Sequence, residues 1–246
     1  MTYQLKYGSY TFPRGMYPSD NNVPSTVPQS KHPRLDGGRI LTPTLGLKLI
    51  TVKGGIVAPA GTSARTIVDG MKAAVLQGPA NLTFQSDRYW RNVVCRDFKD
   101  GHPGTHYDRI DDIEIDLITG DPFQYETATQ TLALTPSSTT VSGTATAAGN
   151  AYSKPVISFT AASTNLNLSC YNDTTAESFT LVGTVVSGDV VIVDCLNETV
   201  TIAGVDKMSF FEGTFPRLSV GGNIIRATYL SSALSAISVA WANRWY

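Results

Sequence analysis

Eight short apolar runs follow one another after residue 153, and turn residues separate them. The runs are residues 154–161, 166–171, 178–186, 190–196, 198–204, 208–215, 223–230 and 236–241. None has helical spacing, and Gly, Asn and Asp cluster between them, as is typical of short strands joined by tight turns. A series of this kind predicts an antiparallel β-sandwich or jelly roll.

One segment ahead of these runs, residues 62–77, has helical periodicity. Its apolar positions are Ala64, Ile67, Val68, Met71, Ala74 and Val75. Thr62 or Ser63 can cap the start, because a side-chain oxygen there accepts an unpaired backbone N–H, and Gly78 can end the helix. Gly70 costs a helix about 1 kcal/mol relative to Ala, which favours a close packing contact at that position. The sequence therefore predicts one helix over 62–77.

The other periodic segments of this part read as strands at residues 81–85, 89–98 and 110–118. Residues 47–58 read as two short strands around the Gly54-Gly55 pair. In 110–118 three acidic side chains alternate with three apolar ones, which predicts a strand with one face in water.

The two parts of the chain differ in charge density. Residues 1–125 carry 26 charged side chains and residues 126–246 carry 13, which places a domain boundary at about residue 125. Six of the 13 prolines lie within the first 45 residues. Because proline fixes φ and lacks an N–H donor, residues 13–43 are expected to form an extended arm or a long loop.

The net charge and the cysteine content of the chain exclude several classes of protein. The net charge is −1, so the basic footprint that nucleic-acid backbones require is absent. Cys95, Cys170 and Cys195 show no C-x-x-C spacing and are expected to be small buried hydrophobes. The chain shows neither a signal-peptide pattern nor an apolar run of about 18 residues. We expect a protein made in the cytoplasm, with no membrane insertion and no specific nucleic-acid binding.

The segment around His102 and His106 is the best metal candidate. Two histidines four residues apart would share a helix face and could bind zinc, but Gly101, Pro103 and Gly104 are incompatible with a helix. The nearby carboxylates are those of Asp97, Asp100, Asp108 and Asp111. We expect a charged hairpin tip here and no metal site.

Catalytic machinery is not expected either. The carboxylates of Asp111, Asp112, Glu114 and Asp116 could form a glycosidase pair, but their alternation is that of a solvated strand face. The sequence holds no nucleophile elbow and no P-loop. We therefore assign no catalytic, cofactor-binding or metal-binding residue, and no cofactor.

Aromatic residues of the second part could stack on sugars, as exposed Trp and Tyr do in β-sandwich lectins. They are Tyr152, Tyr171, Tyr229, Trp241, Trp245 and Tyr246. Trp241 is in phase with Ile237 and Val239, which predicts that it packs in the last strand. For Trp245 and Tyr246 both readings stay open.

Residues 210–229, FFEGTFPRLSVGGNIIRATY, predict a corner of the sandwich. Leu218 and Val220 are expected to enter the core on either side of Ser219. The pair Gly221-Gly222 permits the positive φ of a tight turn, and a strand returns from there.

Several motifs in order resemble one known family. They are VKGGIVA, DRYWRNVV, IEIDLITGDPFQY, GNAYSKPVISF, GDVVIVDCLNETV and FPRLSVGGNII. In order and spacing the chain resembles, over nearly its whole length, the distal tail protein (Dit) family of bacteriophages with long non-contractile tails. Residues 13–43 look longer than the corresponding part of that family.

The resemblance implies a mainly β structure with a ring-forming domain at 1–125 and a galectin-like sandwich at 126–246. It implies a structural hub that is not an enzyme: a homohexameric ring at the tail tip of the virion, assembled in the host cytoplasm. The tail tube protein would lie above and the tip or fibre hub protein below. Tape measure and receptor-binding proteins would be further candidate partners, docked on the sandwich.

Two other readings remain open from the sequence. One is a carbohydrate-binding or adhesin module that holds host glycans with the same sandwich. The other is a tail tube or capsid-associated protein of the same class of virus, against which the second domain argues.

Overall fold

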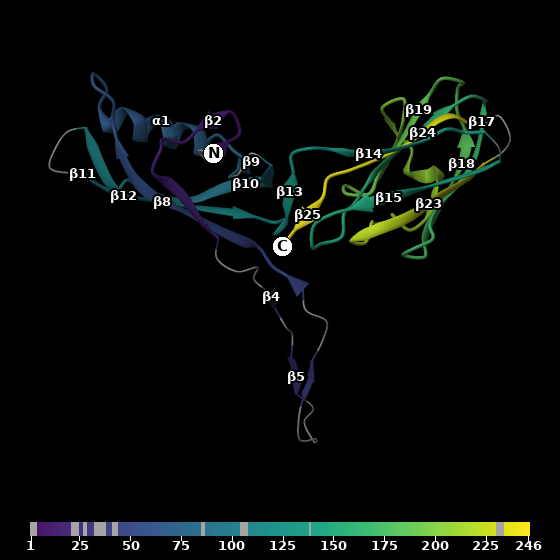
Figure 1. Cartoon of the computed structure of the whole chain (residues 1–246), viewed down its shortest axis with the longest axis horizontal. Helices are drawn as coiled ribbons and strands as arrows, with labels where there is room; N and C mark the ends of the chain where they lie inside the picture. Colours follow the sequence, from purple (N-terminus) through teal and green to yellow (C-terminus); the bar gives the residue numbers. More distant parts are fainter. Residues whose placement is uncertain are drawn as a thin grey trace. The chain divides into compact units, whose positions relative to one another are not determined.

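The computed structural model describes residues 4–20, 25–26, 29–31, 38–40, 44–84, 87–103, 108–137, 139–229 and 234–246 (Figure 1). The chain divides into two compact units, residues 1–127 with Tyr246, and residues 128–245. Each unit has its own cluster of buried apolar side chains. The structure is mainly β with one α-helix among the described residues, as the sequence predicts.

The first unit is an antiparallel sheet with strand order β2-β1-β9-β10-β12-β8-β3. The described strands of the first unit, of which β4 with β7 and β5 with β6 form separate pairs, are as follows. They are β1 Lys6–Tyr7, β2 Tyr10–Thr11, β3 Met16–Asp20, β4 Ser25–Thr26, β5 Gln29–Lys31, β6 Gly38–Ile40, β7 Thr44–Leu45, β8 Lys48–Val57, β9 Ala80–Thr83, β10 Arg88–Lys99, β11 His102–Pro103, β12 Arg109–Thr119 and β13 Gln124–Glu126. The strands expected at 81–85, 89–98 and 110–118 are confirmed as β9, β10 and β12.

The helix α1, Ala64–Leu76, covers one face of this sheet (Figure 1). Its start is capped by Ser63, whose hydroxyl accepts the backbone N–H of Thr66. The buried face consists of Ala64, Val68, Met71 and Val75. Gly78 follows the helix with a φ of +127°, the positive value that favours glycine. The predicted helix, its cap and its end are thus confirmed.

The packing role expected for Gly70 is wrong. A Cβ at that position would meet no atom within 4 Å, because the residue lies on the exposed side of α1. The glycine therefore lowers helix stability without a packing contact in return.

The two short strands expected around Gly54-Gly55 are also wrong, because β8 runs unbroken through both glycines. A Cβ at Gly54 would lie 2.0 Å from the backbone oxygen of Gly15. Only glycine lets β3 approach β8 so closely, and Gly54 pairs there with Met16. The pair therefore permits a close strand contact and does not end a strand.

The proline-rich region is organised as a ladder in its described parts. β3 pairs with β8 from Met16↔Gly54 to Asp20↔Ile50, and β4 pairs with β7 in the same register. β5 and β6 continue the antiparallel pairing with a shift of one residue. The described parts of this region are therefore paired strands, and whether the whole of 13–43 is an arm or a long loop stays a prediction. Pro18 is tolerated because β3 is an edge strand.

The second unit has two antiparallel sheets, ordered β14-β24-β16-β19-β20-β21 and β15-β23-β17-β18-β22. Its elements are β14 Gln130–Leu134, β15 Thr140–Ala147, β16 Val156–Ala161, β17 Asn165–Asn172, β18 Glu177–Thr184, β19 Val190–Asp194, β20 Thr199–Ile202, β21 Val205–Asp206, the 3-10 helix η1 Met208–Phe210, β22 Phe211–Gly213, β23 Gly221–Tyr229, β24 Leu234–Trp241 and β25 Arg244–Trp245. Both sheets contribute to one buried cluster. The sandwich is confirmed, except that the run 208–215 begins as a 3-10 turn.

The corner ahead of β23 is held by a buried asparagine. Asn223 accepts the backbone N–H of Ser219 at 2.9 Å and donates to the backbone oxygens of Ser219 and Gly221 at 2.8 and 3.0 Å. Leu218 is fully buried as expected, but Val220 is 52% exposed, so its predicted place in the core is wrong. The turn points Val220 outward because Asn223 takes the inward position.

Cys170 and Cys195 are buried, as the sequence predicts, whereas Cys95 is half-buried. In the described residues no helix is both long and apolar enough to cross a membrane.

Candidate assembly surface

The face of the first sheet that lies opposite α1 carries side chains in cross-strand rows, and we call it the open face. Strand alternation places Ile113, Ile115 and Leu117 in the core beneath the helix and their neighbours on the open face. Across β3, β8, β12 and β10 the open face is formed by Tyr17, Ser19, Leu49, Thr51, Lys53, Glu114, Asp116, Ile118, Val94, Asp97 and Lys99. The polar side chains that alternate with apolar ones in 110–118 thus form part of the open face.

The first row is ionic. Glu114 lies between two lysines, with 3.0 Å from its carboxylate oxygens to the Nζ atoms of Lys99 and of Lys53. Hydrogen bonds from Lys99 and then from Lys53 lower the pKa of the Glu114 carboxyl. The bond to Glu114 raises the pKa of Lys99 in turn. Tyr17 extends the row on β3 and is 64% exposed.

The next two rows are polar and then apolar. In the polar row the hydroxyl of Thr51 donates to Asp116 at 2.9 Å, and Ser19 donates to the backbone of Thr51. In the apolar row Ile118 pairs with Leu49 on one side and Val94 on the other. A surface with ionic, polar and apolar bands offers both specificity and apolar contact area to a protein partner.

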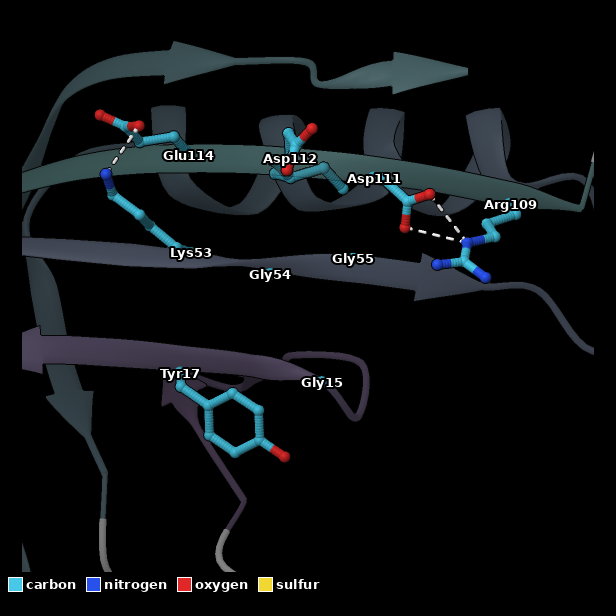
Figure 2. A pocket seen from close by; sticks show the side chains of 10 residues that line it. Gly15, Tyr17, Lys53, Gly54, Gly55, Arg109, Asp111, Asp112 and Glu114 are labelled. Carbon is cyan, nitrogen blue, oxygen red and sulfur yellow. Dashed lines mark hydrogen bonds and ion pairs between the residues drawn. The ribbon is translucent and has the colours of Figure 1, made fainter. Parts of the chain in front are cut away.

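A trough of about 840 Å³ lies beside the ionic row, on the side away from the polar row and toward the start of β12. Its floor is Gly55, since no side chain projects from β8 there (Figure 2). One wall carries Lys53 and Glu114, and the other carries Arg109, whose Nε donates to both carboxylate oxygens of Asp111 at 2.9 and 2.8 Å.

Asp112 completes the trough and occupies an irregular position. Its φ is +59°, and the pairing of β12 with β8 shifts register between Ile110 and Ile113. The bulge breaks the alternation expected from the sequence, so Asp112 does not stand in line with Glu114 and Asp116. Among the described residues Asp112 has no ion-pair or hydrogen-bond partner.

The predicted hairpin near the histidines is partly described. β11 pairs with β12 through His102↔Asp111, while His106 lies outside the described residues. Asp100 ion-pairs with Lys72 and Arg65 of α1, and these bonds, that from Lys72 first, lower its pKa. Within the described residues no group of three His, Cys, Asp or Glu side chains could hold a metal ion.

The aromatic residues of the second unit offer little open ring surface. Trp241 is buried in the core with Ile237 and Val239, as predicted. Tyr229 is buried as well. The guanidinium of Arg226 lies 4.3 Å from the ring centroid of Tyr171.

The three remaining aromatic candidates are covered, half-buried or part of the first unit. Arg244 and Arg217 lie over the ring of Tyr152 at 5.1 and 5.6 Å. Trp245 is half-buried, and Tyr246 is 46% exposed and belongs to the first unit. The arrangement offers a sugar few stacking surfaces among the described residues of the sandwich.

Sequence reasoning missed the trough. Its residues come from β3, β8 and β12, and only the Gly54-Gly55 pair within a strand-like run could have marked a close backbone approach.

The second unit matches a known family. Residues 148–245 fit the model described as "Siphovirus-type tail component, C-terminal domain" (SPP1_Dit). The resemblance to the distal tail protein family is thus confirmed in this part of the chain. No curated protein matches the chain by sequence.

Solved structures with the same fold extend the likeness to the whole chain. The crystal structure of the Dit protein (gp 19.1) of phage SPP1 has a TM-score of 0.77 at 14% identity, with 100% of both chains covered. The activated baseplate of phage P2 with Ca or with Sr gives a TM-score of 0.55 at 10% or 9% identity, covering 99% of this chain and 98% of the other. Over the whole of the given sequence the chain therefore has the fold of the SPP1 Dit protein.

Proposed function

We propose that this chain is the structural hub of a phage tail tip and has no enzymatic role. Six copies form a ring through the domain at 1–125, and the ring joins the tail tube to the tip or baseplate. The sandwich at 126–246 is the platform on which tip or receptor-binding proteins dock. The observation that carries this proposal is the fold likeness to the SPP1 Dit protein over the full length of both chains.

The open face supports an assembly role for the first unit. It combines exposed ion pairs with the apolar row around Ile118, and that combination suits a contact between folded protein surfaces. Ring formation would take place in the host cytoplasm, and the finished protein would be part of the virion.

The test is the mass of the purified chain in solution, together with electron microscopy. We expect a particle of six times the 26.4 kDa subunit mass, seen as rings that associate with the tail tube protein. A strict monomer at high protein concentration that forms no rings with the tube protein would contradict the proposal.

A carbohydrate-binding role is less well supported, because arginines cover the rings of Tyr152 and Tyr171. A glycan array with the full chain separates the two functions. Binding at millimolar concentration or better that is lost in Trp245→Ala would favour the adhesin.

A further inference from the structure

We propose that the outer edge of β15, Thr140–Ala147, binds an extended, uncharged segment of a tip or receptor-binding protein as an additional strand of the sandwich. We call this site the β15 edge. The inference rests on the proposed function, because it specifies where a partner docks on the sandwich. It goes beyond that function by naming backbone pairing as the mode of recognition.

β15 is the first strand of its sheet and, among the described residues, pairs with β23 alone (Figure 1). The ladder runs residue for residue from Thr140↔Thr228 to Ala147↔Gly221 without a register shift. Alternate residues of such a strand direct their N–H and C=O groups to opposite sides, so about four of the eight residues direct theirs away from β23. At about 3.3 Å per residue this row is about 26 Å long. The β15 edge is therefore a regular template for a further strand.

The other three described edge strands of the sandwich are blunted, as edge strands of soluble proteins usually are. β21 has two residues, ends with Asp206 and is followed by Lys207. β22 has three residues, with Glu212 in the middle and Gly213 at a φ of +122°. β14 has five residues and is followed two residues later by Pro136. β15 is the longest of the four and contains neither a charged residue nor a proline.

The absence of charge extends beyond β15 and defines the chemistry of the partner. Residues 127–153, which include both β14 and β15, contain no Asp, Glu, Lys or Arg. The guanidinium of Arg226 on the neighbouring β23 is already bonded to both carboxylate oxygens of Asp173. A charged side chain in a docked strand would lose water and gain no opposite charge from these residues. The β15 edge therefore fits an uncharged segment.

The side chains of β15 specify the two faces of that segment. On the outer face Ser142, Thr144 and Thr146 are exposed, and Thr or Ser on an adjacent strand would form favourable cross-strand pairs with them. On the inner face Val141 and Leu132 pack against the sandwich core and are only half-buried. Apolar side chains of an added strand would cover them and remove apolar surface from water. The partner segment is therefore expected to alternate hydroxyl and apolar residues.

The test is hydrogen exchange of the full-length protein with synthetic peptides of about nine residues in which Thr and Val alternate. One peptide has Lys at both ends and the other has Glu, so that attraction by charge alone can be recognised. We expect both peptides to slow exchange of β15 amides at least about tenfold and to leave β21 and β22 unchanged. The matched control peptide has Pro in place of the central Val and should give no protection, because Pro removes a donor.

Variants of the protein locate the binding site. Thr144→Lys with Thr146→Lys gives β15 the charge that blunted edges carry and should weaken binding of the lysine-flanked peptide at least about tenfold, measured by fluorescence anisotropy. Asn167→Lys with Thr199→Lys adds the same charge at exposed positions of the interior strands β17 and β20. This control should bind the peptide as the parent protein does, and urea unfolding checks that both variants are folded.

The outcomes separate the two proposals. Failure of both peptides to protect β15, or equal protection by the Pro peptide, would overturn the docking mode. Protection of β15 in the protein alone that is lost on dilution would show that a second copy occupies the edge, and the partner proposal would be wrong. If rings form without protection of β15, the hub function stands and this inference fails. If β15 is protected but no rings form, the edge stands and the hub function fails.

Discussion

Asn223 and Ser219 bond to each other in both directions: the side chain of Asn223 accepts the backbone N–H of Ser219 and donates to its carbonyl oxygen. The Asn223 amide also accepts a bond from Asn172, which donates to the backbone of Arg217. Two buried side chains therefore satisfy backbone groups of a corner that is also held by the antiparallel bridge between Leu218 and Ser153, and the corner depends on them.

Replacing Asn223 by Ala should lower the free energy of unfolding by about 2–4 kcal/mol, because several buried backbone groups lose their partners. Urea unfolding of the full chain measures the effect. Asn167→Ala on the exposed face of β17 is the matched control and should change stability by less than about 0.5 kcal/mol. Equal stability of the two variants would contradict the role assigned to Asn223.

Replacing Gly70 by Ala should stabilise the first unit by about 0.5–1 kcal/mol, since the new methyl group meets no atom and the helix loses less backbone entropy. Thermal unfolding should show an increase in Tm of about 2–5 °C. Gly78→Ala is the opposite control: its φ of +127° is unfavourable for alanine, so its Tm should fall. A Tm for Gly70→Ala below that of the parent protein would show that the glycine has a packing role after all.

The features that could be predicted from the sequence depend on residues that lie close together along the chain. The cap at Ser63, the end at Gly78 and the alternation around Ile115 are set by local spacing, and the structure confirms them. The continuity of β8 through Gly54 depends on how closely β3 approaches, which no local pattern records.

The ladder of the proline-rich region and the trough lay beyond sequence reasoning for a related physical reason. The pairing of β4 with β7 joins short polar segments that have no apolar alternation. The trough joins residues of three strands, and its shape depends on a β-bulge at Asp112. Both features are produced by register between distant segments, and register is weakly specified where neither face is strongly apolar.

The cysteines should differ sharply in reactivity. Burial raises the pKa of Cys170 to about 12 and raises that of Cys195 as well. At pH 8 about one Cys170 side chain in ten thousand would be the reactive thiolate. A thiol reagent should therefore modify at most one cysteine per native chain, Cys95, and all three after unfolding.

Mass spectrometry of the modified protein gives the count for each state. Cys95→Ser should show no native modification. Rapid modification of Cys170 in the native protein would mean that the sandwich core opens readily.

The ionic row should make stability depend on pH in a defined direction. Lys99 and Lys53 lower the pKa of Glu114 in the folded protein. A carboxyl with a depressed folded-state pKa stabilises the protein above its unfolded-state pKa of about 4.3, and the contribution is lost as the pH falls through the folded value. Glu114→Gln should therefore be less stable than the parent protein at pH 7, and the two should converge at pH 2.

Urea unfolding between pH 2 and pH 7 measures this difference, which should be small because the pairs are exposed and should shrink in 1 M salt. Glu212→Gln on the exposed strand β22 is the matched control and should follow the parent at every pH. A constant difference between Glu114→Gln and the parent over the whole range would show that the substitution acts through packing. In that case the ionic row would contribute no charge-dependent stability, and this face would be stabilised by its hydrogen-bonded polar row and its apolar row.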